Sequence, residues 1–206
     1  MESTIHPPSK PIALNSNYIA GENRTLGLRC PDRHFRDAVV CDETGFKLFD
    51  FNAKELGTSW TLRRRLVGSK TKQHILDLRH TKMDLKTWIL EDSSGNKVCK
   101  IKDVTSSSAF RGSGFTAVDA QVLANDSEEV IIEMRCFDKA GSRTSFQSDG
   151  AVIAELTLMD NNDASFLHKR GLDRTTWKLE VAKGVDITLV VGLAFARAEI
   201  MHAWRR

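Results

Sequence analysis

The stretch DITLVVGLAFA, residues 186–196, decides the fold. It is apolar on every side of a helix, and a helix without a polar face must be surrounded by other apolar groups. About eleven residues of helix rise only roughly 16 Å, too short for the roughly 30 Å hydrocarbon core of a bilayer. We therefore expect protein around a central helix at about residues 186–204, in which Asp186 caps the N-terminus. The residues that define this helix are Asp186, Ile187, Leu189, Val190, Leu193 and Phe195.

Most of the chain before this helix is typical of β-strands. From residue 35 onward, runs that alternate polar and apolar side chains are separated by Gly, Asn, Asp and Ser. In residues 129–138, Val130, Ile132 and Met134 share one face. We therefore expect one side of this strand to be buried and the other to be exposed to solvent. About ten such strands in an open sheet would leave two edges, and a barrel removes both. The pattern predicts a mainly β fold, a closed antiparallel barrel around the apolar C-terminal helix.

The N-terminal residues and the cysteines indicate how the chain is divided into domains and in which cellular compartment we expect it. All four prolines lie at or before residue 31, which predicts an extended or partly disordered N-terminal arm over residues 1–30 and one barrel domain over 31–206. The N-terminus lacks the apolar stretch of a secretory signal, and the four scattered cysteines lack metal-ligand spacing. We expect a cytoplasmic protein with reduced thiols, no metal, no cofactor and no transmembrane segment.

Charge is informative only where it clusters, because a net charge of +3 is too small to indicate nucleic-acid binding. Within one strand, Arg63 and Arg65 point to one face and Arg64 to the other, beside leucines. With the following turn and the next strand, they make up a candidate anionic-lipid site: Arg63, Arg64, Arg65, Lys70, Lys72, Arg79, Lys82 and Lys86. Basic residues near an anionic membrane contribute about 1 kcal/mol each. The alternative is a solvated wall balanced by acidic residues, and we interpret a second basic strand, residues 97–102, in that way.

The order of several segments resembles the LURP-one-related family, whose fold is shared with the tubby C-terminal domain and, more distantly, with phospholipid scramblases. The segments are CDETGFKLFDF (41–51), WTLRRRL (60–66), LKTWILEDSSGNKVCKIKD (85–103) and VAKGVDITLVVGLAFARAEI (181–200). The resemblance covers roughly residues 35–202 and implies a barrel of about twelve antiparallel strands around a central helix. Tubby domains bind phosphoinositides with basic residues on the barrel wall. Members often carry an aliphatic residue and two acidic ones where this chain has Arg197-Ala198-Glu199, and we interpret Arg197 as the point where the helix leaves the barrel. A buried, paired Arg197 is the alternative.

Three classes of function stay open. The leading hypothesis is a non-catalytic binding module that recognises phosphoinositides or other anionic lipids at a membrane surface. The second is a protein-interaction or signalling scaffold that uses loop surfaces and the N-terminal arm. The third, an enzyme or a carrier of an apolar ligand, is disfavoured because the helix fills the lumen and because GxSxG, HExxH and P-loop patterns are missing. The expected partners are anionic phospholipid headgroups or proteins, and no specific nucleic acid.

Overall fold

The computed structural model describes residues 4–30, 37–53, 63–81, 84, 86–105, 116–123, 129–138, 141–159 and 175–203. These residues form twelve strands, a short 3-10 helix η1 (Ser16–Tyr18) and the C-terminal helix α1 (Ile187–Ala203). The strands are β1 (Arg24–Cys30), β2 (Asp37–Asp42), β3 (Lys47–Ala53), β4 (Arg63–Gly68), β5 (His74–His80), β6 (Thr87–Asp92), β7 (Lys97–Asp103), β8 (Ala117–Leu123), β9 (Glu129–Cys136), β10 (Arg143–Ser148), β11 (Ala151–Leu158) and β12 (Thr175–Val181).

The strands form one closed antiparallel barrel in which each strand pairs with its neighbours in sequence. Closure comes from β1 and β12, which pair antiparallel with Leu26 opposite Leu179. The predicted alternation is confirmed in β9, where Ile132 and Met134 are buried while Ile131 and Glu133 are exposed. Since the strands close on themselves, this sheet has no free edge to protect.

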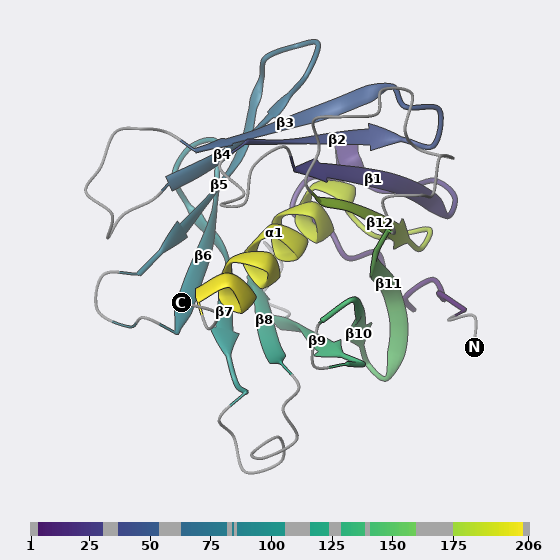
Figure 1. Ribbon diagram of the computed structural model, residues 1–206, viewed down its shortest axis with the longest axis vertical. Coiled ribbons are helices and arrows are strands. Elements are labelled where there is room, and N and C mark those ends of the chain that lie inside the picture. Colours follow the sequence, from purple (N-terminus) through teal and green to yellow (C-terminus); the bar gives the residue numbers. More distant parts are fainter. Residues whose placement is uncertain are drawn as a thin grey trace.

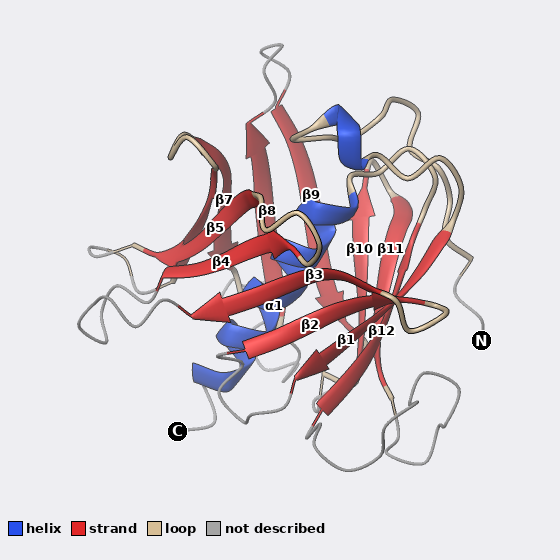
Figure 2. Cartoon of the chain, turned by 90° about the horizontal axis from the view of Figure 1, so that it is seen from above, coloured by secondary structure: helices blue, strands red, loops and turns tan. Residues whose placement is uncertain are grey.

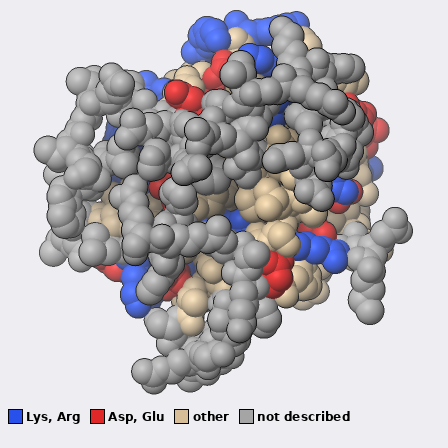
Figure 3. All heavy atoms as spheres, in the orientation of Figure 1, with Lys and Arg blue, Asp and Glu red and all other residues tan. Residues whose placement is uncertain are grey.

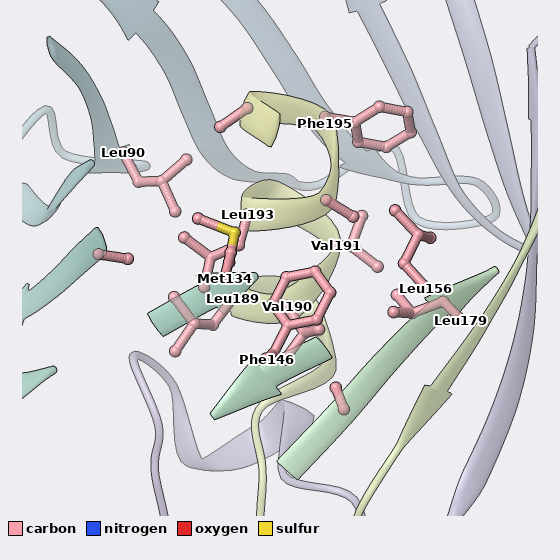
Figure 4. Packing of buried hydrophobic residues seen from close by; sticks show 14 of the residues in the cluster. Leu90, Met134, Phe146, Leu156, Leu179, Leu189, Val190, Val191, Leu193 and Phe195 are labelled. Carbon is pink, nitrogen blue, oxygen red and sulfur yellow. The ribbon is translucent and has the colours of Figure 1, made fainter. Parts of the chain in front are cut away.

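Helix α1 runs through the middle of the barrel, as Figures 1 and 2 show from two directions. Leu189, Val190 and Leu193 are buried completely, and the ring of Phe195 stacks on that of Phe51 with 4.1 Å between centroids. Wall side chains point toward the helix from several strands (Figure 4). The predicted barrel around an apolar helix is therefore confirmed. No helix in the described part of the chain is long and apolar enough to cross a membrane.

Helix and wall approach each other closely at Gly192. A Cβ atom built there would lie 3.1 Å from Cδ1 and 3.2 Å from Cδ2 of Leu90, and 3.6 Å from Cδ1 of Leu76. Carbon atoms in good contact are roughly 3.5–4.0 Å apart. The absence of a side chain at Gly192 therefore lets α1 approach strands β5 and β6.

Asp186 begins the helix as the sequence predicts, and it also anchors the N-terminal arm. Its Oδ1 accepts hydrogen bonds from the backbone N–H groups of Thr188, at 2.7 Å, and Leu189, at 3.2 Å. Its Oδ2 accepts from the N–H groups of Leu14 and Asn15, both at 3.0 Å. One buried carboxylate thus caps the helix and ties down a segment that lies more than 170 residues away in sequence.

The N-terminal segment contributes to the barrel, in part as a strand. The sequence predicts an arm through residue 30, whereas residues 24–30 form β1 and close the barrel against β12. Residues further upstream hydrogen-bond to the turn before α1, with Ile12 N–H donating to Gly184 O at 3.0 Å and Ala20 N–H to Val185 O at 2.9 Å. The arm therefore ends before β1 and not at residue 30, because prolines mark extended chain but do not reveal where strand pairing starts.

Candidate functional site: the basic wall

The pairing of β4 with β5 brings the predicted arginines together on the outer face of the barrel. Arg63 lies opposite Arg79, and Arg65 lies opposite Asp77. On the next strand, Glu91 of β6 lies opposite Asp77. Because alternate residues of a strand share a face, all five side chains project away from the central helix.

Each of these arginines binds a carboxylate. Arg65 donates from Nε to Asp77 Oδ1 at 2.9 Å and from Nη2 to Oδ2 at 3.1 Å. Arg63 donates to Glu91 Oε2 at 2.8 Å, and Arg79 donates to Glu91 Oε1 at 2.7 Å. The hydrogen bond to Asp77 raises the pKa of the Arg65 guanidinium, which stays charged. Asp77 and Glu91 are therefore acidic residues that balance the basic ones by direct contact.

The two signs of charge differ in their access to solvent. The side chain of Arg63 is 42% exposed, whereas those of Asp77 and Glu91 are 2% and 6% exposed. The carboxylates lie beneath the guanidinium groups and hold them in place. An approaching molecule therefore meets the positive charges first.

Strand β7 extends this positive surface. Lys97, Lys100 and Lys102 are exposed on the outer face, while Cys99 and Ile101 point inward and are buried. Among the described residues these three lysines have no ion-pair partner. We define the basic wall as the outer face of β4 to β7, with Arg63, Arg65, Arg79, Lys97, Lys100 and Lys102. The alternating lysines are visible in the sequence, but their place beside the arginines follows from the order of the strands.

The β4–β5 turn carries two more of the predicted residues. Lys72 Nζ lies 3.1 Å from Asp50 Oδ2, and Lys70 Nζ lies 4.4 Å from the centre of the Phe46 ring. Basic side chains gather at the upper edge in Figure 3, where Figure 1 places this turn. Phe46 is itself 44% exposed, so this edge combines cations with an aromatic ring. Lys86 is exposed beyond β5, and Lys82 lies outside the described residues.

Arg64 points the other way, into the barrel, as the sequence predicts. It is 4% exposed and forms an ion pair with Glu199 of helix α1. Loss of either partner of this buried ion pair would leave an unpaired charge in the interior. A ligand on the outer face cannot contact Arg64, so a lipid site has to depend on its neighbours.

The interpretation of Arg197 as the exit point of the helix was wrong. Helix α1 continues to Ala203, and Arg197 is 1% exposed. Its Nη2 donates to the Gly141 carbonyl oxygen and lies 3.5 Å from Cys136 Sγ, and its Cζ lies 5.0 Å from the centre of the Trp177 ring. The barrel wall thus extends beyond the apolar stretch. Arg197 contacts a backbone carbonyl and an aromatic ring. Contacts of this kind with distant residues cannot be recognised from a sequence pattern.

These features together define a class of protein: a small antiparallel barrel closed around its own C-terminal helix, with a cationic outer wall. Among the described residues, no group of three or more His, Cys, Asp or Glu side chains could hold a metal ion.

Comparison with known proteins assigns the family. The model of the LURP-one-related family matches residues 26–198, and the chain belongs to this family. A crystal structure of a protein from Arabidopsis thaliana is similar in fold, with a TM-score of 0.61, 14% sequence identity, and coverage of 95% of this chain and 99% of that one. No match was found among curated proteins. The resemblance inferred from the sequence is therefore confirmed.

Proposed function

We propose that this protein is a non-catalytic binding domain that recognises anionic lipids, phosphoinositides among them, through the basic wall. The observation that carries the proposal is the layering of charge, with exposed Arg63 above the buried carboxylates of Asp77 and Glu91. The exposed lysines of β7 continue the same face. Lipid headgroups present dense negative charge on a surface, which such a face complements.

The lysines of β7 are expected to contribute more than the arginines. The guanidinium groups already bind carboxylates, so part of their charge is compensated within the protein. Lys97, Lys100 and Lys102 are exposed and form no ion pair with a described residue. At about 1 kcal/mol for each basic residue near an anionic membrane, the three together contribute about 3 kcal/mol, or roughly a hundredfold in affinity.

The edge near the β4–β5 turn gives the proposal a direction of approach. Phe46 is exposed, and Lys70 lies over its ring. Aromatic and basic side chains together are favoured in the interfacial layer of a membrane. We therefore propose that the protein meets the membrane with this edge and with the basic wall behind it.

The test is co-sedimentation with phosphatidylcholine vesicles that contain or lack phosphatidylserine and a phosphoinositide. The decisive variant changes Lys97, Lys100 and Lys102 to Gln, which alters charge without breaking a described ion pair. The control for net charge changes Arg24, Lys178 and Lys183 to Gln, with the same loss of charge, on and beside strands β1 and β12, across the barrel from β6 and β7. Arg24 and Lys178 lie 3.6 and 2.9 Å from Glu22 and Glu180, so this control also opens two ion pairs, of a surface type that contributes only about 0–1 kcal/mol each.

We expect the β7 variant to bind acidic vesicles roughly a hundredfold more weakly and the control to keep most of its affinity. Binding by the unchanged protein should also weaken steeply between low salt and 0.5 M salt, at a Debye length of only about 4 Å. Equal losses in the two variants would show attraction by net charge alone. Failure of the unchanged protein to bind acidic vesicles would reject lipid recognition and favour the protein-interaction scaffold.

A further inference from the structure

Two buried hydrogen-bond donors at Arg197 and Trp177 have no acceptor among the described residues. Arg197 lies at the end of the barrel where β9 ends and where β10 and β12 begin. Its Nη2 is bound to the Gly141 carbonyl oxygen. Its Nε is buried and has no hydrogen-bond partner among the described residues, and the same is true of Nε1 of Trp177, the residue over whose ring the guanidinium lies.

The positive charge of Arg197 also lacks a counter-charge in the described part of the chain. The side chain that it contacts on β9 is the thiol of Cys136, which in turn lies 3.4 Å from the hydroxyl of Thr144. The carboxylate two residues further along the helix, Glu199, pairs with Arg64 on the opposite wall. The groups described around this guanidinium are thus a carbonyl, a thiol, a hydroxyl and an indole, all of them neutral in their ordinary forms.

A buried cation is costly unless it is paired, and a buried N–H group is costly unless it finds an acceptor. A water molecule would satisfy the N–H groups but would leave the charge uncompensated. A small anion would satisfy both requirements at once, because ionised acceptors form the stronger hydrogen bonds to guanidinium groups.

We propose that Arg197 and Trp177 form a binding site for a small monovalent anion, a carboxylate or a halide, at the barrel end. Arg197 Nε supplies the charged hydrogen bond, and Trp177 Nε1 supplies a second, neutral one. The site lies inside the barrel at the far end of the helix from Asp186. It is independent of the basic wall, and either proposal can fail without the other.

The experiment titrates the full chain with sodium formate and, separately, with sodium chloride at constant ionic strength maintained by sodium methanesulfonate. The melting temperature and, for chloride, the NMR line width report binding. We expect a saturable rise in melting temperature with formate, chloride or both. A response to formate alone assigns the site to carboxylates, and a response to chloride alone assigns it to halides.

Two variants and a control connect the response to the site. Arg197→Met removes the charged donor at similar size, and we expect an apparent affinity at least about tenfold weaker, as for the loss of a charged hydrogen bond. Trp177→Phe removes only a neutral donor, and we expect a loss of about threefold to tenfold. Arg64→Met is the control, since Arg64 is equally a buried arginine but is paired with Glu199, and it should keep the anion response.

The proposal is overturned if the unchanged protein shows no saturable response to either anion. It is also overturned if Arg197→Met retains the response of the unchanged protein. Should Arg197→Met fail to fold, Trp177→Phe decides, because unaltered affinity in that variant removes the indole from the site and with it the proposed arrangement.

Discussion

Replacement of Gly192 by Ala should be destabilising in the native barrel and stabilising once Leu90 is shortened. In an exposed helix, Gly→Ala stabilises by about 1 kcal/mol because alanine loses less backbone entropy. In this helix the new Cβ would lie 3.1 and 3.2 Å from the two Cδ atoms of Leu90. These distances are shorter than good carbon contacts, so Leu90 or the helix has to shift.

The magnitude follows from these two opposing effects. Overpacking a core typically costs about 1–3 kcal/mol, against a gain of about 1 kcal/mol from helix propensity. Gly192→Ala alone should therefore lower the free energy of unfolding by up to about 2 kcal/mol. Leu90→Ala removes both crowded carbons and should cost about 2–5 kcal/mol by itself, because it leaves a cavity.

The double variant is decisive. In the Leu90→Ala background the crowded contacts with Leu90 are gone, so Gly192→Ala should raise the free energy of unfolding by about 1 kcal/mol and partly fill the cavity. The assay is urea unfolding of all four proteins, followed by tryptophan fluorescence and circular dichroism, with the urea dependence required to be the same throughout. An equal cost of Gly192→Ala in both backgrounds would refute the reasoning, and so would full stabilisation in the unchanged barrel.

Three further changes test other parts of the architecture. Asp186→Ala should lower the free energy of unfolding by at least about 2 kcal/mol, the upper range for loss of an N-cap, because the buried carboxylate also holds the N-terminal arm. Limited proteolysis should then cut the first twenty residues faster. An unchanged cleavage rate would contradict this anchoring role of Asp186. Arg64→Met should lower the free energy of unfolding by about 3 kcal/mol, because Glu199 is left as an unpaired charge. The double variant Arg64→Met, Glu199→Met should recover much of that stability in thermal unfolding. A double variant no more stable than the single one would argue against the ion pair. The Asn96 side chain, followed by backbone N–H groups, lowers the pKa of Asp92, so that this group contributes stability above about pH 4 and the contribution disappears as pH falls through the folded pKa. Asp92→Asn should therefore show a flatter loss of stability than the unchanged protein as the pH falls below about pH 4, and parallel curves would be the contrary result.

Patterns local to a few residues were sufficient to predict most of the fold. The alternation in β9 identified its buried face, and the all-apolar stretch after Asp186 required a surround that a barrel provides. The N-cap at Asp186 and the inward direction of Arg64 followed from position alone. In each case the relevant signal is a periodicity or a cap, which neighbouring residues in the sequence determine.

Other features depended on partners that are distant in sequence. The sequence places Arg63 and Arg65 on one face, but the burial of Asp77 and Glu91 beneath the guanidinium groups depends on the strand register. The burial of Arg197 depends on how far the barrel wall extends along the helix beyond its apolar stretch. No local sequence pattern indicates that distance.

The sequence by itself determined the kind of molecule: an antiparallel barrel, its apolar central helix, the residue that caps this helix, and which face of a strand is buried. Only the tertiary structure decided which charges reach solvent, that Arg197 is enclosed, and that residues 24–30 close the barrel while the segment before them is tied to Asp186. The physical reason is that the direction of a side chain is a property of its own strand or helix, whereas its partner and its exposure are set by register and closure between segments far apart in the chain.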